Sequence, residues 1–343
     1  MKVLYITYEW NFTKTCSSVF FPELLKNYFD VELYMLKDDT DLDFTKINSP
    51  VYDAVIFFQC EPDFTKVQNK NTIFVPMYDT FGFTSKRIRA LKNIKLINFS
   101  KRLHKESIRY GINSFYIQYY PPVNYNVTQG TRSRVFFWNR QKSFDGETIC
   151  NAVLPDNLSE YGIEYVNIHS TGKPQDAKAD APNIPANTKN SSQTMHGAKL
   201  VHTSWFDKKE DLTDLLDQTR YYFAPRDKEG IGFSFLDALE HGCVIIAHNE
   251  GTMNEYIQNG INGYLINYKR PKTINFKDFD IIQQNSTDSM IKGRKIYEET
   301  IPKMIDFIKE PCTKHHPLKN AAGTFTVNFV RLTDKVLRIL KVR

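Results

Sequence analysis

The feature that most constrains the fold is a regular alternation of short apolar runs with helix-like stretches. The run at 2–7 has the length and residues of a strand, 18–29 those of a helix, and 31–36 those of a second strand. Further apolar runs of strand length occupy 52–59, 71–78, 95–100, 134–139, 162–169, 198–205, 221–225 and 243–248. Because these runs are predominantly apolar, they suit parallel strands that helices cover on both faces. The sequence therefore predicts an α/β fold built on doubly wound parallel sheets.

A single strong interruption divides this alternation. Residues 119–134 contain two prolines, a glycine and a polar run, which favours a linker, and 343 residues suit two domains. We predict a first Rossmann-like domain at 1–125, a linker at 126–133, a second Rossmann-like domain at 134–325 and a closing helix at 326–343. The polar run 171–197 is long for a connection and predicts a mobile or partly disordered surface loop.

Composition removes several classes of function. A formal charge of +6, from 45 basic and 39 acidic residues, is too mild to argue for nucleic acid but suits an anionic substrate. The five cysteines are scattered without a CxxC pair, so neither a disulfide framework nor a zinc site is predicted. No apolar run approaches the roughly 18 residues of a membrane-spanning helix, and the start does not resemble a secretory signal, so a cytoplasmic protein is expected.

Chemistry concentrates between Arg226 and Ala247. An apolar strand ends at Pro225, a loop carries Glu229 and Gly-Ile-Gly, and a helix follows that contains Asp237. Small residues at a helix start let backbone N–H groups face a ligand, and the helix dipole favours phosphate there. Carboxylates beside such a turn offer acceptors to sugar hydroxyls. The stretch predicts a site for a phosphorylated sugar.

The same stretch resembles the C-terminal half of retaining, GT4-like glycosyltransferases of the GT-B fold (glycosyl transferases group 1). The first matching pattern comprises Pro225, Glu229, Gly230, Gly232, Phe233, Asp237, Ala238, Gly242, Val244, Ile245 and Ala247. The second pattern comprises Gly251, Glu255, Ile257, Gly260, Gly263 and Leu265. Together they span about forty residues at fixed spacing, whereas a lone Gly-x-Gly would say little.

This resemblance implies a GT-B fold, with two Rossmann-like domains facing a central cleft, of which 1–125 is the acceptor-side domain and 134–325 binds the nucleotide sugar. It also assigns roles to residues. Glu229 would contact the donor sugar, and Asp237 the ribose. Arg140 and Lys142 would bind the diphosphate. The remaining donor-binding residues would be Gly230, Ile231, Gly232 and Phe233. No metal or other cofactor is implied, because fixed cations can stabilise the leaving diphosphate.

The chain departs from the family pattern at three places. Asp237 stands where the family has Glu, one methylene longer. Tyr78 and Asp79 stand where many members have a His-Asp pair beside the donor sugar, so we place them near the sugar. The start of the chain lacks the family's glycine-rich loop.

The function implied is transfer of a sugar, with retention of configuration, from a nucleotide-diphosphate sugar to a hydroxyl acceptor. A UDP-sugar is the favoured donor, and a polysaccharide, lipopolysaccharide or glycolipid intermediate is the expected acceptor. The basic stretch 329–343 is either the closing helix, which we favour, or a helix in peripheral contact with the inner membrane face.

Other interpretations remain beside this one. Glu229 alone could be a solvated loop acid, Asp237 a helix acid, Arg140 and Lys142 surface cations, and Tyr78 a packing residue. At the level of the whole chain, the rivals are a GT-B epimerase or phosphorylase, and a degenerate module that binds a sugar nucleotide without turnover.

Overall fold

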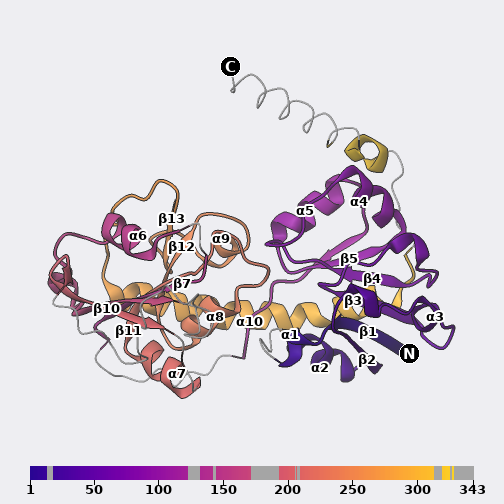
Figure 1. The fold of residues 1–343 in the computed structure, drawn as a ribbon, viewed down its shortest axis with the longest axis horizontal. Coiled ribbons are helices and arrows are strands. Elements are labelled where there is room, and N and C mark those ends of the chain that lie inside the picture. Colours follow the sequence, from indigo (N-terminus) through magenta and orange to yellow (C-terminus); the bar gives the residue numbers. More distant parts are fainter. Residues whose placement is uncertain are drawn as a thin grey trace, which may run out of the picture. The chain divides into compact units, whose positions relative to one another are not determined.

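The computed structural model describes residues 1–13, 18–122, 132–141, 144–170, 193–204, 206, 209–312, 319–324 and 327. The chain forms two compact units (Figure 1). Unit 1 holds residues 1–119 and the chain from Ile296 onward, and unit 2 holds Tyr120–Lys295.

Unit 1 is built on a parallel sheet with strand order β2-β1-β3-β4-β5-β6. Its strands are β1 (Lys2–Tyr8), β2 (Asp30–Leu36), β3 (Ala54–Phe58), β4 (Thr72–Val75), β5 (Lys95–Asn98) and β6 (Ser114–Tyr116). Its helices are α1 (Trp10–Thr13), α2 (Phe20–Lys26), α3 (Phe44–Ile47), α4 (Ser85–Ala90) and α5 (Lys101–Arg109), with 3-10 turns η1 (Asp39–Asp41), η2 (Phe64–Lys66) and η3 (Leu91–Asn93). Every residue of β3, β4 and β5 is buried, as expected for strands covered on both faces.

Unit 2 is built on a sheet of order β13-β12-β11-β7-β8-β10-β9, in which only the β9–β10 pair is antiparallel. Its strands are β7 (Arg134–Asn139), β8 (Tyr165–Ser170), β9 (Thr194–Met195), β10 (Ala198–Ser204), β11 (Thr219–Phe223), β12 (Val244–His248) and β13 (Tyr264–Ile266). Its helices are α6 (Gly146–Val153), α7 (Lys209–Asp217), α8 (Phe233–Glu240) and α9 (Met253–Tyr256), with the 3-10 turn η4 (Leu158–Tyr161).

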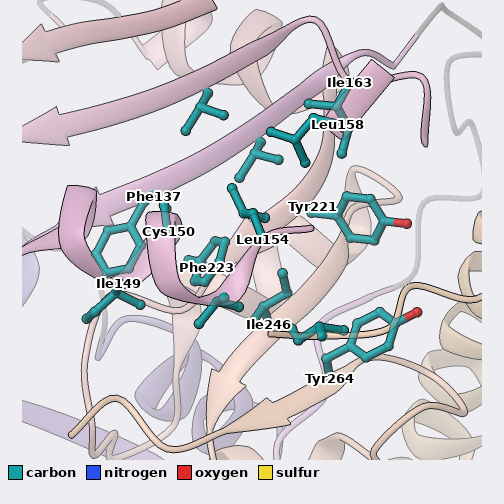
Figure 2. Close-up of a cluster of buried hydrophobic side chains, with 14 of the residues drawn as sticks. Phe137, Ile149, Cys150, Leu154, Leu158, Ile163, Tyr221, Phe223, Ile246 and Tyr264 are labelled. Atoms are coloured by element: carbon teal, nitrogen blue, oxygen red, sulfur yellow. The ribbon is translucent and has the colours of Figure 1, made fainter. Parts of the chain in front are cut away.

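The core of unit 2 lies between this sheet and α6. Phe137, Phe223 and Ile246 come from three neighbouring strands and pack toward Ile149 and Cys150 of the helix (Figure 2). All five side chains are buried. The sheet is therefore held rigidly beneath the loops that leave its carboxyl edge. The predicted doubly wound α/β fold is confirmed in both units.

A long helix, α10 (Phe279–Lys309), was not predicted, and it changes the assignment of the chain's last third. The sequence predicts one domain over 134–325, but residues from Ile296 pack with unit 1. The buried Lys95 amine of β5 donates hydrogen bonds to the carbonyl oxygens of Phe307, Ile308 and Glu310. A buried cation at the carbonyl end of a helix is favoured by the helix dipole. These contacts attach the end of α10 to unit 1.

Three predictions fall on residues outside the described part. Most of the linker 126–133, most of the loop 171–197 and all of the closing helix 326–343 except Val327 lie there.

Candidate active site

The carboxyl ends of β7 and β11 meet at the point where the strand order of unit 2 reverses. The chain begins this sheet with β7, adds β8 and β10 on one side, and returns through α7 to add β11 on the other side. In open α/β sheets, ligands bind outside the carboxyl ends of strands at such a switch point. Asn139 ends β7 and Phe223 ends β11, so the loops that follow these two residues form the candidate site.

The loop after β11 is fixed at both of its ends. At its start, the Ala224 amide donates to the Ile246 carbonyl (2.9 Å), and the buried Tyr268 hydroxyl donates to the Ala224 carbonyl (2.6 Å). At its end, Gly232 adopts a left-handed conformation with φ of 91° and begins α8. A Cβ at this position would lie 1.9 Å from Cε1 of Phe235, so only glycine fits.

The start of α8 has the features of an anion site. Gly232 is the N-cap residue and supplies no side-chain acceptor to the first-turn amides. Such amides carry the positive end of the helix dipole. Gly230 and Ile231 are buried beside them, so the backbone here is shielded from bulk water. The arrangement suits a phosphate group held by backbone N–H groups.

Glu229 immediately precedes this turn and is only 8% exposed, so it is not a solvated loop acid. The hydroxyl of Thr252 donates to the backbone carbonyl of Glu229 (2.6 Å) and lies 3.4 Å from that of Gly230. Thr252 is completely buried and has a φ of 59°, an uncommon conformation for a residue other than glycine. A residue in such a strained backbone conformation persists only where the contacts of the surrounding structure hold it in place. Thr252 is thus a positioning residue for the turn.

Removing this hydroxyl should loosen the turn. The Thr252→Val variant is expected to lose about 1–3 kcal/mol of unfolding free energy, because the Glu229 carbonyl then loses its partner in a buried setting. Binding of a nucleotide diphosphate should weaken several-fold. Urea unfolding and titration calorimetry measure the two effects. Thr252→Ser keeps the hydroxyl and should stay near wild type; equal losses in both variants would contradict this positioning role.

Arg140 follows β7 and lies on the other side of the switch point. Its guanidinium carbon is 4.8 Å from the centre of the Trp138 ring, and its side chain is exposed. The next residue, Gln141, accepts a hydrogen bond from the Asp227 amide (3.2 Å), which joins the two loops. Burial raises the pKa of Tyr222; the positive charge of Arg140 opposes this shift, and the charge of Glu229 adds to it. The charges of Arg140 and Glu229 therefore both influence the ionisation of the same buried phenol, that of Tyr222.

The other predicted residues lie on α8, in unit 1 or outside the described residues. Asp237 is half-buried on α8, five residues beyond the N-cap. Lys142 lies outside the described residues. Tyr78 and Asp79 lie in unit 1, after β4 rather than within a strand. Tyr78 is 9% exposed and packs in the hydrophobic core of unit 1, with its ring 5.7 Å from the Arg102 guanidinium. Its predicted place beside the sugar stays a prediction.

A buried histidine stands beside Trp138, near the carboxyl end of β8. His169 is 2% exposed, its ring stacks on Phe206 with centroids 4.4 Å apart, and its Nδ1 lies 2.9 Å from the Thr203 hydroxyl. Burial lowers the pKa of His169 to about 4. The neutral ring is therefore part of the folded state.

This histidine should make unit 2 sensitive to acid. Unfolded His169 takes up a proton near pH 6.5 and the folded one only near pH 4, so its contribution to stability is complete above pH 6.5 and falls as the pH drops toward 4. Between pH 7 and pH 4.5, wild type should lose about 2–3 kcal/mol more than His169→Gln. Denaturant unfolding at both pH values tests this; equal losses in the two proteins would contradict it.

The described residues offer neither a metal cluster nor a membrane-spanning helix. Within those ranges, no group of three or more His, Cys, Asp or Glu side chains could hold a metal ion. Among the helices described, none combines the length and apolar character needed to span a bilayer.

Comparison with known proteins supports the assignment of the fold. Residues 183–292 match the family model described as glycosyl transferases group 1, and this range includes Glu229, Gly232 and Asp237. Over the matched range, the resemblance to glycosyl transferases group 1 is confirmed. No curated protein matches the sequence.

Solved structures extend the likeness beyond the matched range. A glycosyltransferase from Rickettsia africae ESF-5 is 13% identical with a TM-score of 0.56, covering 90% of this chain and 98% of its own. The chain has the GT-B fold. Sucrose-phosphate synthase from Thermosynechococcus elongatus is 9% identical with a TM-score of 0.54, covering 88% of this chain and 100% of its own. S. aureus TarM aligns with 75% of this chain at a TM-score of 0.48, and the chain spans about half (55%) of that protein.

The sequence analysis did not identify two residues that hydrogen-bond to the loop of the candidate site. Gln141 and Thr252 hydrogen-bond to the loop before α8 from other loops of unit 2. Threonine and glutamine are common in loops, and a positive φ leaves no mark in residue type except at glycine. The sequence held no signal that would have identified either residue.

Proposed function

We propose that the chain transfers a sugar from a nucleotide-diphosphate sugar, with UDP as the favoured nucleotide, to a hydroxyl acceptor. The observation that carries this proposal is the buried Glu229 beside an uncapped helix start, across the switch point from Arg140. The family match over 183–292 supports the same reaction class. A saccharide or glycolipid is the acceptor class that we favour.

Each group has a defined task in this reaction. As the bond between sugar and phosphate breaks, negative charge grows on the leaving diphosphate. The N–H groups at the start of α8 and the Arg140 guanidinium stabilise that charge, with Lys142 as the second cation. Glu229 accepts hydrogen bonds from sugar hydroxyls and orients the ring. Asp237 contacts the ribose.

We further propose that the configuration of the sugar is retained. The acceptor hydroxyl then attacks on the face from which the diphosphate departs, and its proton passes to a departing phosphate oxygen. No residue acts as a nucleophile in this scheme. The task of the protein is to position both substrates and to stabilise charge.

Fixed cations and helix amides make a divalent metal unnecessary for diphosphate departure in this proposal. Donor turnover should therefore stay within about twofold of its starting rate after treatment with EDTA, measured as release of nucleotide diphosphate. A complete loss that Mg²⁺ or Mn²⁺ restores would contradict the proposed role of Arg140.

A nucleotide screen tests the function itself. The full chain is heated with UDP, GDP, ADP and their sugar conjugates, and the melting temperature is recorded. A ligand at a hundred times its Kd stabilises the fold by about 2.7 kcal/mol, which is easily detected. We expect UDP and one UDP-sugar to stabilise the fold, and that donor to be consumed slowly in water. Binding without any turnover would favour a degenerate module, and no binding would overturn the proposal.

A further inference from the structure

Tyr120 lies at the point where the chain enters unit 2. The chain passes from unit 1 to unit 2 between Tyr119 and Tyr120, and it leaves unit 2 again between Lys295 and Ile296. The two crossings are joined inside unit 2, because the Arg294 guanidinium donates a hydrogen bond to the Tyr120 carbonyl at 2.9 Å. Tyr120 is therefore held where two segments meet that are far apart in the sequence.

The ring of Tyr120 packs directly on the backbone of α10. A Cβ at Gly293 would lie 2.2 Å from both Cε1 and Cζ of this ring, so a residue with a side chain would displace it. Glycine is a poor residue for the interior of a helix, and here the close approach of the ring gives it a packing role. Gly293 thus leaves a gap in the surface of α10 that the Tyr120 ring fills.

Two further rings connect Tyr120 to the turn before α8. Tyr120 lies beside Tyr256 of α9, with ring centroids 5.0 Å apart. Tyr256 is 6% exposed and meets the fully buried Phe235 edge-on, with centroids 5.4 Å apart. Phe235 covers Gly232 so closely that a Cβ there would lie 1.9 Å from its Cε1. Three rings in contact therefore run from Gly293 to Gly232, all within unit 2.

The middle ring belongs to a helix that also holds the first part of the turn. Helix α9 has four residues and follows Thr252, whose hydroxyl donates to the Glu229 carbonyl at 2.6 Å. This helix thus contacts the turn at two places, through Thr252 at Glu229 and through Tyr256 and Phe235 at Gly232. Because α9 is so short, a displacement of Tyr256 would disturb both contacts.

The three rings act by packing and not by charge. Burial, followed by the charge of Glu255, raises the pKa of Tyr120 to about 12, so its phenol is neutral at physiological pH. Close-packed interiors transmit displacement, because side chains that interdigitate leave few alternative positions to one another. The position of the Tyr120 ring therefore restricts the positions of Tyr256 and Phe235.

We propose that Tyr120 is a positioning residue for the donor diphosphate, acting through Tyr256 and Phe235 on the backbone of Gly232. The geometry of the phosphate-binding turn then depends on the point at which the chain enters and leaves unit 2. That the turn holds a donor rests on the proposed sugar transfer, whereas its support by Tyr120 does not.

Amide hydrogen exchange tests this support without any ligand. The amides of Phe235 and Leu236 both donate to the Gly232 carbonyl at 3.1 Å, so their exchange reports on the turn. In the full chain, Tyr120→Leu should raise their exchange about tenfold or more, because local opening becomes easier when packing is lost. Exchange in β8 should change less than twofold. Unchanged exchange at both amides, or equal acceleration throughout unit 2, overturns the inference.

UDP affinity tests the positioning role itself. Tyr120→Leu should weaken UDP binding about tenfold, whereas Tyr120→Phe keeps the ring and should stay within twofold of wild type. Tyr119→Leu is the matched control, because Tyr119 packs on Phe20 and Tyr297 of unit 1 and takes no part in the contacts that reach Gly232. A loss of less than threefold in Tyr120→Leu, or an equal loss in Tyr119→Leu, overturns the inference.

The Gly293→Ala variant displaces the same ring from the side of the helix. Its Cβ should force Tyr120 out of the gap in α10 and weaken UDP binding about fivefold. Combined with Tyr120→Leu, it should weaken UDP binding no further than Tyr120→Leu alone, because both changes act on one ring. Losses that add in the double variant would show two separate effects and overturn the inference.

The two readouts separate this inference from the proposed function. Faster exchange at Phe235 and Leu236 in Tyr120→Leu, together with no UDP binding by wild type, would reject the proposed function and leave Tyr120 assigned as the support of the turn. UDP binding and donor turnover by wild type, with unchanged exchange and affinity in Tyr120→Leu, would do the reverse.

Discussion

Donor turnover by the Glu229→Gln variant is expected to fall between about tenfold and 150-fold. Glu229 is 8% exposed, so the isosteric amide should pack in its place without a cavity. The substitution removes the charge that accepts hydrogen bonds from the sugar, and hydrogen bonds to a charged group contribute about 1.5–3 kcal/mol each. UDP lacks the transferred sugar that Glu229 is proposed to contact, so its affinity should be nearly unchanged. The measurements are donor hydrolysis, UDP titration and thermal unfolding.

An exposed acid of the same unit provides the matched control. Glu164 precedes β8 at the opposite edge of the sheet, and Glu164→Gln should leave all three measurements near wild type. Unchanged turnover in Glu229→Gln would show that this acid only packs. If Glu229→Gln lost UDP binding and stability as well as turnover, the whole turn would have collapsed. That result would contradict a specific role of Glu229 toward the sugar.

The Gly232→Ala substitution should damage the turn itself. The new Cβ would lie 1.9 Å from Cε1 of Phe235, a fully buried ring that packs edge-on against Tyr256 with centroids 5.4 Å apart. The φ of 91° adds backbone strain. Overpacking and strain each cost about 1–3 kcal/mol, so a total loss of about 2–6 kcal/mol is expected. Because the amides of the α8 start would be displaced, UDP affinity should fall tenfold or more.

The Gly197→Ala variant distinguishes backbone strain from overpacking as causes of that loss. Gly197 also has a positive φ, 85°, but a Cβ there would meet no atom within 4 Å. Gly197→Ala should therefore cost only the backbone strain, about 1–2 kcal/mol, and leave UDP binding intact. If the two glycine variants unfold alike and both bind UDP normally, the close approach at Gly232 has no part in the site.

Most strands of this protein could be predicted because they are largely apolar runs, whereas β6 and β9, with three and two residues, are too short to form such a run. The run 54–58 and the run 244–248 are buried along nearly their whole length, which is the condition that produces such runs. Helix α10 could not be predicted in the same way. Its polar composition gives a weak pattern, and its attachment to unit 1 depends on Lys95, more than two hundred residues earlier.

The candidate site likewise contains one part that local sequence predicts and another part that depends on tertiary structure. Glu229 and Gly232 lie in one continuous motif, because a strand, a tight turn and a helix start must be adjacent in sequence to form a cradle. Arg140 and Thr252 come from separate loops. Parallel strand order decides which loops meet, and that order is a tertiary property which local residue patterns do not encode.

The central claim is that the main chain from Glu229 to Phe233 holds the diphosphate of the donor. A crystal structure of the protein with UDP tests it most directly. We predict the β-phosphate against the backbone N–H groups of Gly230, Ile231 and Gly232, with Arg140 directed toward it and the Glu229 carboxylate facing the empty sugar position. UDP bound elsewhere in the chain, or a diphosphate that makes no contact with this turn, would contradict the account.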